Sequence, residues 1–333
     1  MAATLRTYLE LVRFSHTIFA LPFAIMAGMI AARVELADNP YVSTLHWVKI
    51  SAGIIACMAT ARTAAMGFNR LVDRHIDARN PRTANRHLPK GLLSVGEVQK
   101  LVCSSSFLFV ISTFLFLPNW LPLVLSLPVL VWLLGYSYAK RFTSFAHIWL
   151  GIALGLTPLA AWIAVRGPAV LSDPADMLPA LVLAIAVTTW VAGFDTIYAC
   201  QDASFDNTEQ LQSLPSRCGI QNALYLAAFF HFLTILFLLA LPRTTPFIGN
   251  CTSWAIYGIA GLLVVEHLLI SSRDLSRVNQ AFFTVNAAIG LMLLSGISMD
   301  LWFGKDFLLF SQLVYGFNRY VRRTQQRFYR KHK

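Results

Sequence analysis

Long apolar stretches recur along almost the whole chain, and they constrain its fold more than any other feature. A helix needs roughly 20 mostly apolar residues to cross the hydrocarbon core of a bilayer, where every backbone polar group must be satisfied internally. The sequence predicts an all-α, polytopic membrane helical bundle of nine transmembrane helices, with short connections punctuated by proline and glycine. The predicted spans cover approximately residues 14–33, 46–68, 99–118, 121–138, 145–165, 178–198, 220–241, 252–271 and 280–299.

The composition excludes an ordinary soluble domain. Hydrophobic residues make up 56% of the 333 residues and charged residues only 13%, against roughly 25% charged residues in soluble domains. The formal net charge is +11, but the sequence contains no basic helix interleaved with aromatic residues of the kind that binds nucleic acid. We therefore expect the lipid bilayer as a partner and no nucleic acid.

Lys and Arg are concentrated in alternate loops. They fill the long loops 69–98 and 199–219 and the short ones that contain Lys140 and Arg273. With the N-terminus inside, all of these loops fall on the cytoplasmic side, as the positive-inside rule requires. We expect a multi-pass protein of the cell inner (plasma) membrane with cytoplasmic active-site loops, whose first apolar stretch is retained as a helix instead of being cleaved as a signal peptide.

The last part of the chain differs from the rest. A transmembrane domain is predicted for residues 1–300, followed by an amphipathic and basic tail over 301–333. Nine spans place this tail outside, although its Lys and Arg residues favour the inside. Residues 301–317 suit either a tenth short span or an interfacial helix that anchors the tail to anionic lipid, and both interpretations remain open.

Two sets of polar side chains extend predicted spans at the membrane edge. Asn69, Asp73 and Asp77 follow one span at the spacing i, i+4, i+8. On a helix this spacing puts all three side chains on one face, rotated by only about 40° per step. The second set repeats the pattern at the end of the sixth span, and comprises Asp195, Tyr198, Asp202 and Asp206.

Clustered carboxylates repel one another unless a cation neutralises them. Oxygen ligands suit Mg²⁺, which commonly bridges protein carboxylates to the phosphates of a substrate. Nearby Arg and Lys side chains would bind the same phosphate oxygens. If only one such motif were present, the simpler interpretation would be a solvated helix end with ordinary surface charge. Five of the 16 acidic residues, however, fall on these two membrane-flanking stripes, and charge beside a membrane tends to mark function.

These residues resemble the UbiA superfamily of membrane prenyltransferases. The first set matches the family pattern N-x-x-x-D-x-x-x-D, and the second matches D-x-x-Y-A-x-x-D-x-x-x-D. The family's R-T-x-N-R loop resembles residues 80–86, and its first-helix segment resembles residues 13–22. The resemblance covers about residues 8–300. Arg70 and His87 depart from the family pattern, which puts the subfamily in doubt but leaves the acidic positions intact.

The resemblance implies a fold and a reaction. Members have nine transmembrane helices around a central cavity that is capped by cytoplasmic loops. They transfer an isoprenoid chain from its diphosphate to an acceptor, usually an aromatic ring. The sequence is most similar to bacterial quinone-pathway members, so polyprenyl diphosphate and a small aromatic acid are the expected substrates. The acceptor is either 4-hydroxybenzoate, or 1,4-dihydroxy-6-naphthoate for menaquinone, and the sequence leaves this choice open.

The resemblance also assigns roles to residues. The expected Mg²⁺ ligands are Asn69, Asp73, Asp77, Asp202 and Asp206. Asp195 and Tyr198 complete the catalytic set, where they would orient the acceptor or stabilise a cation. The expected diphosphate-binding residues are Asn69, Arg74, Arg82, Arg86 and Lys90.

A membrane transporter is the alternative from another functional class. Transporters also place acidic residues inside a bundle, and two stripes four spans apart are compatible with an internal repeat. A transporter site, however, is expected near the bilayer midplane on broken helices, whereas these carboxylates lie at one face. Mg²⁺-dependent release of diphosphate would distinguish the enzyme from the transporter.

Overall fold

The structure, a computed structural model, describes residues 5–12 and 21–304, and this part of the chain consists of helices and the loops between them, without a β-strand. The α-helices are α1 Leu5–Leu11, α2 Leu21–Asp38, α3 Thr44–Arg79, α4 Val95–Ser112, α5 Leu121–Gly135, α6 Ala146–Ser172, α7 Leu178–Ala199, α8 Ala203–Thr208, α9 Leu214–Ala240, α10 Asn250–Leu268, α11 Val278–Gln280 and α12 Asn286–Phe303. Between them lie the 3₁₀ segments η2 Thr113–Phe116, η3 Tyr136–Arg141, η4 Pro174–Met177, η5 Cys200–Asp202 and η6 Leu241–Arg243, and the π-helical segment η7 Ala281–Val285.

Within the described residues, eight helices are long and apolar enough to cross a membrane, and they coincide with the last eight predicted spans. The first predicted span, 14–33, is only partly covered, because residues 14–20 lie outside the described residues. Its remainder forms α2, which carries Arg33, Glu35 and Asp38 near its end and is not among the eight. The predicted polytopic α-helical fold is confirmed, and α2 accounts for part of the first predicted span.

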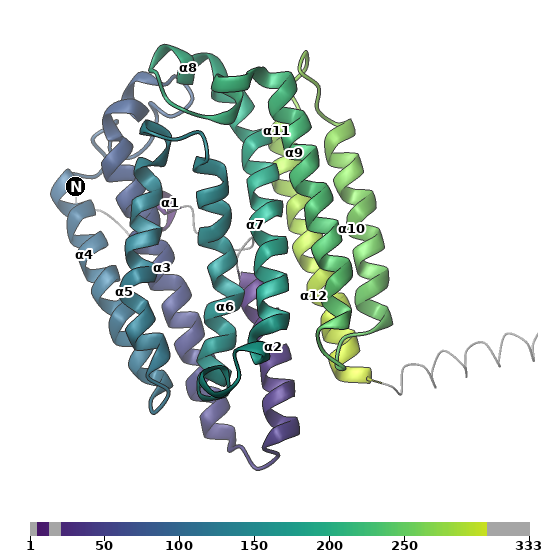
Figure 1. Cartoon of the computed structure of the whole chain (residues 1–333). Helices are drawn as coiled ribbons and strands as arrows, with labels where there is room; N and C mark the ends of the chain where they lie inside the picture. Colours follow the sequence, from purple (N-terminus) through teal and green to yellow (C-terminus); the bar gives the residue numbers. More distant parts are fainter. Residues whose placement is uncertain (1–4, 13–20, 305–333) are drawn as a thin grey trace, which may run out of the picture.

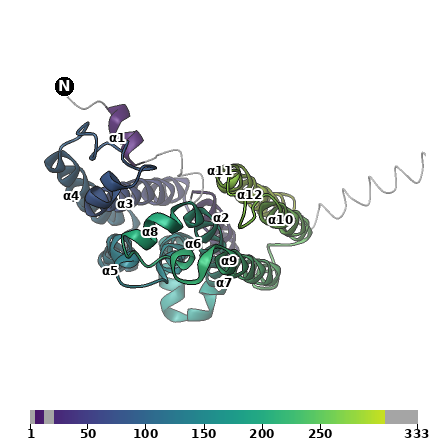
Figure 2. The same ribbon diagram turned by 90° about the horizontal axis from the view of Figure 1, so that it is seen from above.

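The long helices stand side by side and alternate in direction (Figure 1). α6 lies at the middle of the bundle, in contact with α2, α5 and α7, while α3 pairs with α4. α7 packs against α9, and α10 and α12 pair with each other at one side of the bundle, as the view from above shows (Figure 2). α12 contacts α2, so segments from both ends of the described chain are neighbours.

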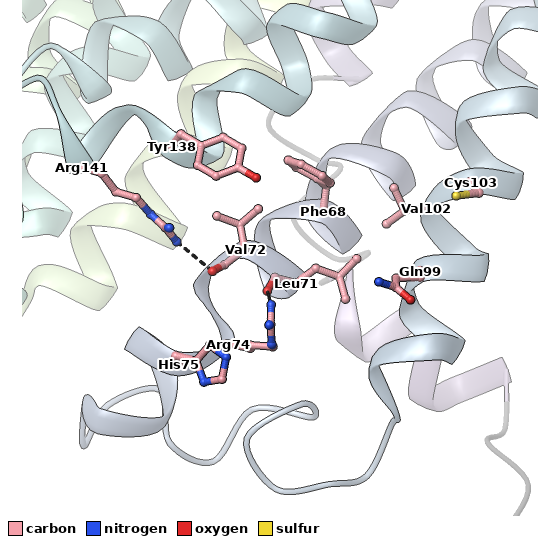
Figure 3. Close-up of a pocket in the computed structure, with 10 residues that line it drawn as sticks. All are labelled: Phe68, Leu71, Val72, Arg74, His75, Gln99, Val102, Cys103, Tyr138 and Arg141. Atoms are coloured by element: carbon pink, nitrogen blue, oxygen red, sulfur yellow. Dashed lines mark hydrogen bonds between the residues drawn. The ribbon is translucent and has the colours of Figure 1, made fainter.

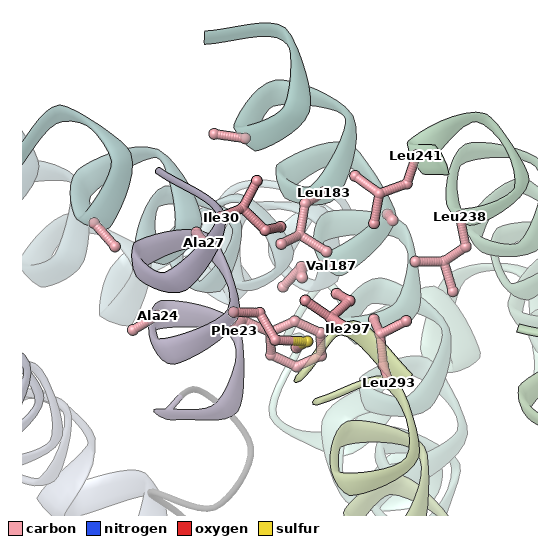
Figure 4. Close-up of a cluster of buried hydrophobic side chains, with 14 of the residues drawn as sticks. Phe23, Ala24, Ala27, Ile30, Leu183, Val187, Leu238, Leu241, Leu293 and Ile297 are labelled. Atoms are coloured by element: carbon pink, nitrogen blue, oxygen red, sulfur yellow. The ribbon is translucent and has the colours of Figure 1, made fainter. Parts of the chain in front are cut away.

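Apolar side chains from α2, α7 and α12 meet in the interior (Figure 4). Phe23, Leu183 and Ile297 are all nearly inaccessible there. Because lipid tails are as apolar as these side chains, close packing holds such helices together more than transfer from water does. The α6–α7 contact illustrates this, since a Cβ added at Gly151 would lie 2.3 Å from the carbonyl oxygen of Thr188.

The length of α3 places the first acidic stripe. Its 36 residues correspond to about 54 Å, well beyond the ~30 Å hydrocarbon core of a bilayer. The helix begins at a Ser43 cap, whose hydroxyl accepts a hydrogen bond from the His46 amide. It ends just before Pro81, which disfavours helical geometry in the preceding residue. The stripe therefore occupies the last turns of α3, at one end of the bundle.

At the C-terminal end, α12 continues to Phe303, slightly past the predicted domain boundary at residue 300. The rest of the predicted tail, from residue 305 onward, lies outside the described residues.

Candidate active site

A polar cavity of about 260 Å³, here called the acidic cavity, lies where α3, η3, α7 and α8 end together. This end of the bundle is uppermost in Figure 1, and we call it the acidic end. The polar and charged side chains that line the cavity include Asn69, Arg70, Asp73, Asp77, Asn80, Arg82, Arg86, Lys140, Arg141, Asp195, Tyr198, Asp202 and Asp206.

The first stripe lies on one helix face, as its spacing predicts. Asn69 donates from Nδ2 to Asp73 Oδ2 at 2.9 Å, and Asp77 lines the same cavity one turn further on. Arg86, from the loop after α3, donates from Nη1 to both carboxylate oxygens of Asp77, at 2.7 and 2.8 Å. Arg141 donates from Nη2 to Asp73 Oδ1 at 3.2 Å. Both carboxylates are thus paired with cations from other segments.

The second stripe continues the sixth span, as predicted. The continuation is not one regular α-helix, because α7 ends at Ala199 and a 3₁₀ turn joins it to α8. Asp202 lies in this turn, where Asn80 donates to its Oδ1 at 3.2 Å. Tertiary hydrogen bonds stabilise the tighter turn, and Tyr198, Asp202 and Asp206 still line one cavity.

Arg82 connects the two halves of the site. Its Nε donates to Asp202 Oδ1 at 2.8 Å, its Nη2 pairs with Asp202 Oδ2, and its Nη1 donates to the Tyr198 hydroxyl at 2.9 Å. Burial opposes the charge of Arg82, but the hydrogen bonds and negative charge of Asp202 outweigh this effect and raise the pKa of Arg82. The guanidinium therefore stays charged and holds the loop after α3 against the end of α7.

Two predicted diphosphate-binding residues do not line the acidic cavity. Arg74 lies one residue beyond Asp73, and one residue rotates a helix by about 100°, so its side chain faces a different pocket on the outer side of α3. There Arg74 donates from Nη1 to the Leu71 carbonyl at 2.7 Å (Figure 3). Lys90 is also absent from the lining of the acidic cavity. Arg82, Arg86 and Asn69 do line it.

An apolar cavity of about 350 Å³ adjoins the acidic one. Met66, Tyr136 and Leu150 line both cavities, so the two are neighbours along the bundle. The apolar cavity extends away from the acidic end between α3, α5 and α6, and its walls are mainly Leu, Ile, Val, Phe and Ala side chains. The acidic cavity thus suits the charged head of an amphipathic molecule, and the adjoining apolar cavity suits its hydrocarbon tail.

Comparison with known proteins agrees with this arrangement. The profile of the UbiA prenyltransferase family matches residues 18–294. The chain belongs to the UbiA prenyltransferase family. It is 30% identical over 243 residues to the 4-hydroxybenzoate octaprenyltransferase of Nitrosomonas eutropha, an alignment that covers 72% of this chain and 79% of that protein. The sequence resemblance is therefore confirmed, and the protein is a membrane prenyltransferase.

Solved UbiA structures share the fold. The UbiA homologue of Aeropyrum pernix K1 superposes with a TM-score of 0.73 at 31% identity, covering 86% of this chain and 98% of that one. A UbiA homologue from Archaeoglobus fulgidus, bound to DMAPP and Mg²⁺, superposes with a TM-score of 0.61 at 17% identity and covers 89% and 99% of the two chains. At that identity the second comparison supports the fold alone.

The structure of this UbiA family member adds polar residues that the motifs did not reveal. His147, fully buried in the first turn of α6, contacts Asp195 through Nδ1–Oδ2 at 2.7 Å. Lys140 Nζ lies 3.9 Å from Asp206 Oδ2. Lys140 and Arg141 follow the fourth predicted span and were recognised only as loop charges. Nothing in the sequence aligns His147 with Asp195, 48 positions away, because only the packing of α6 on α7 joins them.

Proposed function

We propose that the protein transfers a polyprenyl chain from polyprenyl diphosphate to an aromatic acid, 4-hydroxybenzoate or a close analogue, with Mg²⁺ as cofactor and in quinone biosynthesis. The observation that carries this proposal is the direct adjacency of the acidic cavity to an apolar cavity. The name of the Nitrosomonas eutropha relative supports the acceptor and the prenyl donor, and the carboxylates that line the acidic cavity support a metal cofactor.

The donor atoms of the acidic cavity fit Mg²⁺. Carboxylate and amide oxygens from Asn69, Asp73, Asp77, Asp202 and Asp206 surround it, and such hard oxygen ligands are those that Mg²⁺ prefers. Asp206 Oδ2 is buried without a hydrogen-bond partner. Among the described residues, no three Asp, Glu, His or Cys side chains converge on one point. Mg²⁺ commonly keeps several waters and binds through one or two carboxylates together with substrate phosphates.

The basic side chains of the cavity are placed to bind the diphosphate. In the structure Arg82, Arg86 and Arg141 each neutralise one carboxylate. With Mg²⁺ held by the carboxylates, Arg82 and Arg86 would be free to donate to the phosphate oxygens, for which their planar donors are well suited. Buried Arg86 Nε, which has no hydrogen-bond partner, offers a further donor. Arg74 and Lys90 are left out of this group, because neither lines the cavity.

The two cavities then have different roles in the reaction. The apolar cavity holds the prenyl tail, so that its allylic carbon lies at the junction formed by Met66, Tyr136 and Leu150. Bound Mg²⁺ supplies Lewis-acid stabilisation of the leaving diphosphate. The allylic C–O bond breaks and the diphosphate leaves with its electron pair. A ring carbon of the acceptor forms the new C–C bond, and the ring proton passes to water or to the released diphosphate. Asp195 and Tyr198 line the same cavity, where they orient the acceptor ring.

The orientation in the membrane follows from charge. The acidic end carries Arg79 at the end of α3 and Arg82, Arg86 and Lys90 in the loop that follows, and short loops rich in Lys and Arg favour the inner side. The acidic end therefore faces the cytoplasm, and the protein resides in the inner membrane. Labelling a cysteine introduced at Gln210, in the α8–α9 loop, with a membrane-impermeant maleimide tests this. Labelling in inverted vesicles but not in intact cells agrees with it, and the reverse result contradicts it.

The deciding experiment uses the full-length protein in nanodiscs with Mg²⁺ and a long-chain prenyl diphosphate. 4-Hydroxybenzoate and 1,4-dihydroxy-6-naphthoate are offered separately, and product is detected by mass spectrometry. Asp73→Asn and Asp202→Asn should each lower kcat/KM by about 10²- to 10³-fold, whereas Asp274→Asn, on an exposed loop outside the cavity, should not. Product from the naphthoate alone would replace the proposed acceptor. Folded protein that yields neither product nor diphosphate would overturn the proposal.

A further inference from the structure

A second pocket, of about 430 Å³, lies on the outer side of α3, facing α4 and η3 (Figure 3). We call it the outer pocket. Its described lining consists of Phe68, Leu71, Val72, Arg74, His75, Gln99, Val102, Cys103, Tyr138 and Arg141. Arg74 and Arg141 carry positive charge, and no carboxylate is among these residues. The pocket thus has a positive rim and an apolar floor, and of its lining residues only Arg141 also lines the acidic cavity.

The two arginines are held in fixed positions. Arg74 Nη1 donates to the Leu71 carbonyl at 2.7 Å, and Arg141 Nη2 donates to the Val72 carbonyl at 2.8 Å. Figure 3 shows the two side chains ending on these consecutive carbonyls of α3. Each guanidinium has further N–H donors beyond the one that anchors it. Arg141 Nη2 also donates to Asp73 Oδ1 at 3.2 Å. An anion that reaches both guanidinium groups can accept hydrogen bonds from their remaining donors.

An apolar path leads away from the rim along α4. Gln99, Cys103, Phe107 and Ile111 follow one another at intervals of four residues, so they share one face of the helix. Gln99 and Cys103 line the pocket. Phe107 is 66% exposed and Ile111 44% exposed, as expected for side chains that face lipid. The stripe therefore passes from a polar group beside the arginines to apolar groups deeper in the bilayer.

We propose that the outer pocket binds an anionic phospholipid, with its phosphate between Arg74 and Arg141 and an acyl chain along the α4 stripe. The pocket lies at the acidic end, level with the last turns of α3, where headgroups are expected. A soluble phosphate would use the arginines but leave the apolar stripe unexplained. A zwitterionic lipid would cover the stripe, but it lacks the net charge that complements the arginines.

Alkylation of Cys103 tests the proposal without reference to transfer activity. Cys103 is an exposed free cysteine in the pocket lining, so a bound lipid should shield it. The full-length protein in non-ionic detergent is treated with N-ethylmaleimide, and modification of each cysteine is followed by peptide mass spectrometry. The added probes are dioctanoyl phosphatidylglycerol, dioctanoyl phosphatidylcholine and glycerol phosphate. Cys251, in α10 outside the pocket lining, is the internal reference.

We expect phosphatidylglycerol to slow alkylation of Cys103 but not of Cys251, and the other probes to have little effect. Arg74→Gln should raise the concentration of phosphatidylglycerol needed for protection by about tenfold, and Arg74→Lys should have a smaller effect. Lys100→Ala removes a neighbouring exposed charge outside the pocket lining and should change nothing. Equal protection by both lipids, full protection by glycerol phosphate, or unchanged protection in both Arg74 variants would overturn the proposal.

Discussion

Replacement of His147 by Ala should weaken the bundle at the point where three helices meet. His147 belongs to α6, its Nδ1 contacts Asp195 of α7 at 2.7 Å, and its Nε2 accepts a hydrogen bond from the Leu214 amide, the first residue of α9, at 3.4 Å. Because Nε2 accepts, the proton of a neutral imidazole lies on Nδ1, which donates to Asp195. The side chain has 0% exposure, so water cannot readily replace either partner.

The size of the effect follows from these contacts. A hydrogen bond to a carboxylate contributes about 1.5–3 kcal/mol, and a bond as long as that to the Leu214 amide contributes less. Loss of the imidazole also leaves Asp195 without its partner and opens a cavity. Truncating a buried side chain of about this size costs about 3–5 kcal/mol, and we expect His147→Ala to fall in this range. For a chain of this size the apparent melting temperature should drop by roughly 10 °C.

Asp195→Asn is the matched variant. The Asn carbonyl oxygen can still accept from His147 Nδ1, so this change should destabilise the protein by only about 1 kcal/mol. In the double variant no unpaired carboxylate remains. The two effects should therefore be less than additive, with a coupling energy of about 1–2 kcal/mol. Because Asp195 lines the acidic cavity, Asp195→Asn should still reduce prenyl transfer.

Thermal unfolding in one detergent, with activity measured in parallel, checks this reasoning. His147→Ala with wild-type stability would refute the assigned tie between α6, α7 and α9. If Asp195→Asn were as unstable as His147→Ala, Asp195 could not be the hydrogen-bond acceptor of His147 Nδ1 in the assigned way. Additive effects in the double variant would show that the two side chains do not act through each other.

Three further predictions concern other parts of the bundle. Gly151→Ala should destabilise the protein by about 1–3 kcal/mol, because the added Cβ would lie 2.3 Å from the Thr188 carbonyl oxygen. Gly261→Ala, which has open space around the added Cβ, should leave the stability unchanged. Equal losses of melting temperature in the two variants would contradict the close approach of α6 and α7. Asp300→Ala should cost about 1–2 kcal/mol, since Asp300 accepts from the amides at the start of α10; the melting temperature checks this, and no change would exclude a capping role. Arg86→Met should raise KM for prenyl diphosphate by about tenfold while leaving KM for the aromatic acid nearly unchanged; steady-state kinetics would contradict the assigned role if both values rose together.

Much of the candidate site was predictable because its residues repeat along single helices. Asn69, Asp73 and Asp77 share one face of α3 by helical geometry alone, and the same spacing pointed to Asp202 and Asp206. The 3₁₀ turn that joins α7 to α8 was not predictable from that spacing. It depends on hydrogen bonds from Asn80 and Arg82 to Asp202, which lie 122 and 120 positions away in sequence.

The sequence by itself determined the membrane character, the number and place of the last eight spans, and the resemblance to the UbiA family. Long apolar stretches and helical spacing are local properties of the sequence, so they can be recognised without knowledge of the packing. Only the tertiary structure decided that Arg74 faces the outer pocket, that His147 holds Asp195, and that the acidic and apolar cavities adjoin. These features depend on how helices rotate and pack against one another, and that packing is set by contacts between residues far apart in the chain.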